Sequence, residues 1–436
     1  MKTFPIGGVH PHDYKISAQK AIENAPIPAQ VSIFLSQHIG APASAIVAKG
    51  DKVKVGQVIA EAAGFISAPV HSSVSGTVKA VELVKDGGGL RKMAVVIKVE
   101  GDEWDENIDR SEELKSECTL EPKEIIERVK AAGIVGLGGA TFPTNVKLCP
   151  PPGKTAEFLV VNGVECEPYL TADHRLMLER ADEFLVGCKI VMRALGVKKC
   201  YVGIENNKPD AIALLSSKAS DGVEIIPLKV QYPQGGEKQL IAAVSGREVP
   251  SGALPIEVGA VVQNVGTIVA IYEAVQKNKP LFERITTVTG DDVPEPKNLK
   301  VRLGTPISEL LALAKVEGGA KVINGGPMMG RAMANVDAPT TKGTSGVLVM
   351  PQRKALRPKE NACIACAKCV SVCPMGLEPY LLSKIGKLGL SEKALSERAQ
   401  DCIECGCCSF TCPAGVPILD YVRLAKGMAM VELRKK

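Results

Sequence analysis

Aromatic side chains are scarce in this sequence, at 4% of its 436 residues, with a single tryptophan. The hydrophobic cores must therefore be mainly aliphatic, and the 45% of hydrophobic residues supplies enough of them. The net charge is only +5, a balance that indicates no nucleic-acid-binding surface. Long apolar runs are missing too. The most apolar stretch, residues 259–275, contains Gln263, Asn264 and Glu273, so we expect no membrane-spanning helix.

A secretory signal and a disulfide pattern are also missing. Residues 1–8 lack the apolar core of a signal peptide. Six of the 14 cysteines lie outside the motifs described below and show no pairing pattern, which indicates free thiols in a reducing compartment. We therefore expect a chain that reaches a membrane only through its partners. Its length allows two to four domains.

Cysteine is abundant near the end of the chain, in two runs of the form C-x2-C-x2-C-x3-C-P at residues 363–374 and 402–413. Bacterial-type ferredoxins use this run for [4Fe–4S] clusters. Three thiolates on one tight loop can reach one cluster, while the fourth, before a proline, points to the neighbouring cluster. The spacing predicts one cluster on Cys363, Cys366, Cys369 and Cys412, and a second on Cys402, Cys405, Cys408 and Cys373.

A pair of structural zinc sites is the alternative, because zinc also takes four cysteines. Zinc sites usually consist of two separated C-x2-C pairs, so two complete runs followed by proline favour iron–sulfur clusters. Cys407 is one thiol more than the second run needs, and we interpret it as a small residue packed beside the cluster. The basic residues on either side of the runs are interpreted as solvated surface. Clusters of this kind predict electron transfer.

The texture of the sequence predicts four domains. Residues 1–115 consist of short β-branched runs and resemble lipoyl and biotinyl carrier domains, a barrel-sandwich hybrid fold. Ala63, Gly64 and Phe65 occupy the tip where the carrier lysine should lie, so we expect a structural or docking domain. Residues 116–284 alternate strands with helices, which predicts a Rossmann-like doubly wound sheet with ligands at the carboxyl ends of its strands. A small α+β module (285–351) and the cysteine runs (352–436) follow.

The amino-terminal segment contains two histidines, His10 and His12, after Gly7-Gly8-Val9. Histidines at this spacing can bind a metal, but no third ligand is visible. We interpret the segment as a turn packed on the barrel.

Residues 136–147 form a glycine-rich stretch that ends in Lys147. Glycines let backbone N–H groups approach a phosphate, but Thr141 replaces the third glycine of a dinucleotide fingerprint, so a plain turn is the alternative. Downstream, Glu165 and Glu167 follow a predicted buried strand, where carboxylates suit hydrogen bonds to ribose or flavin. The alternative for this stretch is a solvated turn. Two more polar stretches follow, at residues 232–238 and 262–267.

Together these four stretches resemble the flavin- and nicotinamide-binding subunit of respiratory complex I. The resemblance implies that FMN is held by Gly136, Gly138, Lys147, Asn162, Glu165 and Asn264. It also implies that the nicotinamide nucleotide faces Gly139, Phe142, Glu167 and Glu237. Val164 and Gly236 stand where that family has acidic residues.

The complete order of segments is similar to that of the RnfC family of the Rnf electron transport complex, including the Gly325–Gly330 stretch of a β-grasp module of the soluble-ligand-binding type. The resemblance implies a multidomain α/β and α+β chain ending in a two-cluster, ferredoxin-like helical domain. It implies a peripheral subunit on the cytoplasmic face of the plasma membrane, in an ion-translocating ferredoxin:NAD⁺ oxidoreductase with membrane subunits and a ferredoxin-like iron–sulfur subunit. Electrons would pass between NAD(H), FMN and two [4Fe–4S] clusters.

Two other functions stay open at this point. One is a related NADH-dependent FMN and iron–sulfur reductase, such as a cobalamin reductase. The other is a non-catalytic electron-carrying subunit with a degenerate flavin site, which Val164 and Gly236 would permit.

Overall fold

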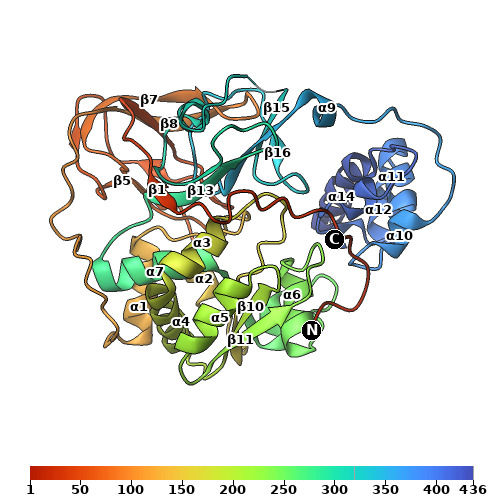
Figure 1. Cartoon of the computed structure of the whole chain (residues 1–436), viewed down its shortest axis with the longest axis horizontal. Coiled ribbons are helices and arrows are strands. Elements are labelled where there is room, and N and C mark those ends of the chain that lie inside the picture. Colours follow the sequence, from red (N-terminus) through yellow and green to blue (C-terminus); the bar gives the residue numbers. More distant parts are fainter. Residues whose placement is uncertain (319, 436) are drawn as a thin grey trace.

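The computed structural model describes residues 1–318 and 320–435 (Figure 1). Two small antiparallel sheets form a barrel near the amino terminus, and their inner faces meet in a core that includes Val31, Ile59 and Ile97. One sheet has the order β2 (Gln30–Phe34), β8 (Arg91–Val99), β7 (Gly76–Lys85) and β4 (Lys52–Val53). The other has the order β3 (Ser44–Ala45), β5 (Val58–Glu61) and β6 (Val70–His71). The predicted barrel-sandwich hybrid is confirmed.

A parallel sheet forms the centre of the second unit, called here the doubly wound domain, with the order β11 (Val223–Leu228), β10 (Cys200–Glu205), β9 (Phe158–Asn162) and β12 (Ala260–Asn264). Alternate side chains of β9 enter two different cores, one on each face of the sheet. One face is covered by α1 (Pro122–Ala131), α3 (Ala172–Glu179), α4 (Ala181–Leu195), α5 (Pro209–Lys218) and α7 (Val265–Lys277). The other face is covered by α6 (Glu237–Ser245) and the 3-10 helix Pro255–Val258.

Helices on both faces confirm the predicted doubly wound architecture. A single helical stretch was predicted from Leu170 to Leu195, but it is interrupted where Arg180 leaves the helical conformation, at φ −127° and ψ 37°. A short helix, α2 (Thr144–Lys147), ends at the lysine of the glycine-rich stretch.

The third unit is a six-stranded mixed sheet with the order β1 (Ile22–Asn24), β14 (Lys297–Arg302), β13 (Glu283–Thr289), β17 (Gly346–Met350), β15 (Lys321–Asn324) and β16 (Arg331–Ala332). The helix α8 (Ile307–Leu313) packs on it. Strand β1 lies parallel to β14, with Ile22 opposite Asn298. The amino-terminal residues are therefore shared with this sheet, and the barrel begins at β2 rather than at residue 1.

The fourth unit, called here the cysteine domain, is helical and carries both cysteine runs. Its elements are α9 (Gln352–Ala355), α10 (Lys368–Ser371), α11 (Pro379–Leu388), α12 (Ser391–Ser396), the 3-10 helix Ala399–Asp401, α13 (Cys407–Phe410) and α14 (Ile418–Lys435). α11 and α14 approach closely at Gly386, where a side-chain carbon would lie 2.0 Å from the carbonyl oxygen of Tyr421. Among the described residues, no helix combines the length and the apolar character needed to cross a membrane.

The amino-terminal segment does not pack on the barrel, and that prediction is wrong. Lys2 forms a β-bridge with Leu228 of β11, and Val9 forms another with Tyr232, so the segment lies along the doubly wound domain. The amide of Gly8 donates to the carbonyl of Val372 in the cysteine domain, at 2.9 Å. Residues 2–13, called here the strap, thus run from one domain to the other (Figure 1).

Candidate functional site

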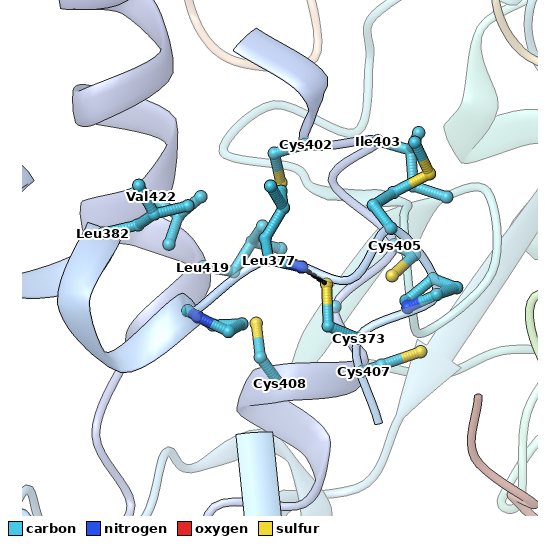
Figure 2. A pocket seen from close by; sticks show the side chains of 14 residues that line it. Cys373, Leu377, Leu382, Cys402, Ile403, Cys405, Cys407, Cys408, Leu419 and Val422 are labelled. Atoms are coloured by element: carbon cyan, nitrogen blue, oxygen red, sulfur yellow. Dashed lines mark hydrogen bonds between the residues drawn. The ribbon is translucent and has the colours of Figure 1, made fainter. Parts of the chain in front are cut away.

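Cysteines from both runs meet around one cavity of about 380 Å³ in the cysteine domain. Cys402, Cys405 and Cys408 line it together with Cys373 of the first run, and Leu382 and Val422 belong to its apolar wall (Figure 2). This is the arrangement that the spacing predicted for the second cluster. Four sulfur atoms in an apolar enclosure fit a [4Fe–4S] cluster, whose ligands are cysteine thiolates.

Two of these sulfur atoms accept backbone hydrogen bonds, one from the amide of Leu377 to Cys373 Sγ and one from that of Glu404 to Cys402 Sγ, both at 3.4 Å. Such bonds tune cluster potentials. The Cys407 side chain, in contrast, points away from Cys408 in Figure 2, and its Sγ lies 3.9 Å from the carbonyl oxygen of Tyr232. It is fully buried, and it packs beside the cavity as a small side chain.

The other predicted ligand set lies toward solvent. Cys363 and Cys366 are exposed, whereas Cys369 is buried and Cys412 is half-buried. Burial raises the pKa of the Cys369 thiol, and the nearby thiols of Cys363 and Cys366 raise it further, which places these three side chains close together. Cys369 and Cys412 pack in the same small hydrophobic core.

The glycine-rich stretch folds into a tight turn beside the amino terminus of α7. The amide of Gly136 donates to the carbonyl of Phe142 at 2.9 Å, and the amide of Leu137 donates to Thr267 Oγ1 at 2.9 Å. Gly139 has φ +112° and faces open space, so its backbone is free to approach a ligand. A side-chain carbon on Gly138 would lie 3.4 Å from Asn264. Backbone amides beside a helix amino terminus fit the phosphate of FMN.

The two predicted asparagines lie side by side at the carboxyl ends of neighbouring strands. Asn162 ends β9 and Asn264 ends β12, and they are register partners in the parallel sheet. The Asn162 amide donates to the carbonyl of Gly235 at 2.8 Å. Asn264 caps α7 by accepting from the amides of Gly266 and Thr267, and it donates to Asp173 at 2.7 Å. The predicted ligand edge of the sheet is thus lined by amide side chains.

Lys147 and Glu237 form an ion pair, with 2.7 Å between Nζ and Oε1. Lys147 comes from α2 and Glu237 begins α6, whose N-cap is Gly236. Nζ also donates to the carbonyl of Val262 in β12, at 3.3 Å. The predicted lysine and acid therefore lie together at the same edge of the sheet.

The two other predicted acids face protein rather than open space. Glu165 has φ +46°, and its carboxylate accepts from the amides of Asp173 and His174, at the beginning of α3. The carboxylate of Glu167 accepts from the amides of Met328 and Met329, at 3.1 and 2.7 Å. The expectation was that Glu165 contacts FMN and that Glu167 faces the nucleotide. Instead, unpaired backbone amides of nearby segments take both carboxylates.

Buried charges near the glycine-rich turn were not predicted. Burial and the neighbouring Glu165 raise the pKa of Asp173 to about 7. Arg284 of β13 is fully buried, and it reaches the carbonyl of Leu137 at 3.5 Å. Burial lowers the pKa of its guanidinium to about 10. A single arginine inside a β-branched strand was the sequence signal that could have drawn attention to it.

Four family models match successive parts of the chain. They are the RnfC barrel sandwich hybrid domain at residues 2–102, the Nuo51 FMN-binding domain at 129–273, the SLBB domain at 285–332 and the 4Fe-4S dicluster domain at 355–413. These matches and the geometry above assign FMN to the doubly wound domain and two [4Fe–4S] clusters to the cysteine domain.

One solved structure of similar fold is an NAD⁺-reducing [NiFe]-hydrogenase in the H₂-reduced state. Its TM-score is 0.51 at 20% identity, over 71% of this chain and 63% of that one. This likeness concerns the fold alone.

Curated relatives are much more similar in sequence, and three of them are C subunits of redox complexes. That of the proton-translocating ferredoxin:NAD(+) oxidoreductase complex of Clostridium ljungdahlii is 48% identical, over 89% of this chain and 85% of the relative. Its Na(+)-translocating counterpart from Acetobacterium woodii is 46% identical, over 89% and 88%. That of the ion-translocating oxidoreductase complex of Rhodobacter capsulatus is 42% identical, over 88% and 75%. The chain therefore belongs to the RnfC family, the C subunits of ion-translocating oxidoreductase complexes.

Proposed function

We propose that this chain is the subunit at which an ion-translocating ferredoxin:NAD⁺ oxidoreductase exchanges electrons with NAD(H). The observation that carries the proposal is the four-cysteine cavity, joined in one chain to a domain of the FMN-binding family. Two relatives that span most of this chain are named as subunits of such oxidoreductases.

The glycine-rich turn and the strand ends supply the groups for FMN. The amides of residues 136–139 and the amino terminus of α7 bind its phosphate, and Lys147 adds a positive charge at the same edge. Asn162 and Asn264 orient the rest of the cofactor from the ends of β9 and β12. Bound FMN exchanges two electrons with NADH and single electrons with iron–sulfur clusters.

The nicotinamide nucleotide enters on the open side of the turn. Gly139 has free space beside it, and Phe142 and Glu237 are partly accessible. Glu165 and Glu167 shape this site indirectly, because Glu165 fixes the start of α3 and Glu167 fixes the loop at Met328–Met329. Orientation is the main task of these residues, since hydride transfer to a flavin is chemistry of the cofactor.

The partners we assign are membrane subunits and a ferredoxin-like iron–sulfur subunit, with this chain on the cytoplasmic face of the membrane. The exposed cysteines of the first run support an exit for electrons toward such a partner. A buried site would be out of reach of another protein.

Anaerobic purification tests the proposal. The chain should contain iron, sulfide and FMN, NADH should bleach the flavin and reduce the clusters, and the native protein should co-purify with membrane subunits. Zinc in place of iron would overturn the cluster assignment. Clusters that NADH never reduces would favour the non-catalytic electron carrier, and reduction of a corrinoid without membrane partners would favour the related reductase.

A further inference from the structure

The chain linker to the cysteine domain does not fix that domain in place. Residues 356–368 are exposed without interruption, and in Figure 1 the chain after α9 makes a wide excursion before it enters the helices. An exposed segment of this kind has few contacts to hold a geometry. Other contacts must set the distance between the four-cysteine cavity and the doubly wound domain.

The strap makes the first of these contacts. The amide of Gly8 donates to the carbonyl of Val372 at 2.9 Å. A side-chain carbon on Gly7, which has φ +71°, would lie 2.6 Å from the carbonyl carbon and oxygen of Cys373. The strap backbone therefore rests directly on the Cys373–Pro374 peptide, and only glycine fits there.

Tyr232 makes the second contact and joins it to the first. Its backbone exchanges two hydrogen bonds with Val9 of the strap, at 2.8 and 2.9 Å. Its side chain is buried, and the hydroxyl donates to the carbonyl of Cys405 at 2.8 Å. One residue of the doubly wound domain thus holds the strap with its backbone and the second cysteine run with its hydroxyl.

Two further contacts end on the same loops. Gln239 of α6 donates to the carbonyl of Pro374 at 3.2 Å. The carbonyl of Met328 lies 3.0 Å from the position that a side-chain carbon on Gly406 would take. These contacts converge on the two loops that line the four-cysteine cavity, whereas Cys363 and Cys366 face solvent.

We propose that the strap and Tyr232 form a clamp that fixes the loops of Cys373 and Cys405 on the doubly wound domain. The clamp sets the distance over which the cluster of the four-cysteine cavity exchanges electrons with the flavin. Each step moves one electron, so the flavin loses one electron and the cluster gains one, and no bond in the protein forms or breaks. Gly7 and Tyr232 are positioning residues, because they act through the ligand loops. This inference rests on the proposed function.

Two variants test the clamp in the full-length protein. Tyr232→Phe removes the hydroxyl that binds Cys405, and Gly7→Ala places a methyl group against Cys373. Tyr201→Phe is the first control, because Tyr201 packs on Phe158 in the same domain. Gly196→Ala is the second, since Gly196 has nearly the same φ, +69°, but open space around it.

The measurements are stopped-flow bleaching of the flavin by NADH, freeze-quench electron paramagnetic resonance of the clusters, and limited proteolysis of residues 356–368. We expect wild-type flavin bleaching in both variants. Cluster reduction should slow by roughly 10- to 100-fold, the scale on which about 1 Å of misplacement acts in an oriented reaction. Proteolysis of the linker should accelerate in both variants, and both controls should match the wild type.

Wild-type cluster reduction and wild-type proteolysis in both variants would overturn the clamp and leave the proposed function intact. A wild-type chain whose flavin NADH cannot bleach would contradict the proposed function instead. The clamp is then judged by proteolysis, which needs neither NADH nor flavin. If Gly7→Ala fails to fold, Tyr232→Phe decides alone, because it removes a single hydroxyl.

Discussion

The ammonium group of Lys147 lies 2.7 Å from Oε1 of Glu237, and the two side chains are 32% and 41% exposed. An ion pair this accessible contributes little to stability, about 0–1 kcal/mol. It marks an edge where charged groups meet solvent and where a phosphate can displace the carboxylate from the lysine. The pair therefore belongs to a ligand site rather than to the core.

Lys147→Ala should reduce the FMN content of the purified protein. A hydrogen bond to a charged group contributes about 1.5–3 kcal/mol, so the affinity for FMN should fall by roughly 10- to 100-fold. Flavin released by denaturation and measured by fluorescence, per mole of chain, checks this. Lys154→Ala is the matched control, since Lys154 pairs with Glu257 elsewhere on the surface. Flavin content equal to that of the control would remove Lys147 from the site.

Cys373→Ser should behave like Cys408→Ser and unlike Cys366→Ser, although Cys373 and Cys366 lie in the same run. The reason is that Cys373 lines the cavity of the second run. Iron analysis and electron paramagnetic resonance should show the same cluster perturbed in Cys373→Ser and Cys408→Ser, and the other cluster in Cys366→Ser. Cys149→Ser, at an exposed thiol, should leave both clusters intact. A Cys373→Ser spectrum that matches Cys366→Ser would reverse the pairing.

The cluster ligands could be predicted because their signal is local. The spacing of each run determines which thiols share a loop, and the proline after Cys373 indicates that this thiol serves the other cluster. The doubly wound sheet was equally accessible, because alternation of strands and helices is a pattern of neighbouring residues.

The path of the strap could not be predicted, because its partners are distant in sequence. Val9 pairs with Tyr232, and nothing in residues 7–12 encodes that partner. The same limit applies to Glu167. A carboxylate after a buried strand indicates a ligand, but amides of Met328 and Met329 occupy it here. Sequence patterns identify the polar groups, and tertiary contacts decide which of them remain free for a ligand.

Glu167→Gln should change how stability depends on pH. Burial raises the pKa of the Glu167 carboxyl from 4.5 to about 7, so the folded protein holds a proton that the unfolded chain releases in this range. The stabilisation is complete below about pH 4.5 and is lost as the pH rises through 7. The wild type should therefore lose up to roughly 3 kcal/mol relative to Glu167→Gln across this window.

The melting temperatures of wild type and Glu167→Gln, measured from pH 4.5 to pH 8, check this expectation. Their difference should shift steadily in favour of the variant as the pH rises. Glu82→Gln, at an exposed position on β7, serves as the control. A difference that stays constant with pH would show that Glu167 is already ionised at the lower end.

Asn264→Ala should destabilise the doubly wound domain by about 1–2 kcal/mol, because two amides of α7 lose their cap. Asn264→Asp keeps the capping oxygen but places a second carboxylate beside Asp173, whose pKa burial and Glu165 have already raised to about 7. Its melting temperature should approach that of the wild type at pH 5, where a proton is shared between the two acids, and fall at pH 8, where the carboxylates repel each other. Asn278→Gly, at the left-handed end of the same helix, should be nearly neutral at both pH values. If Asn264→Asp and Asn264→Ala differ by the same amount at both pH values, then Asp173 is not the partner that matters at this strand end.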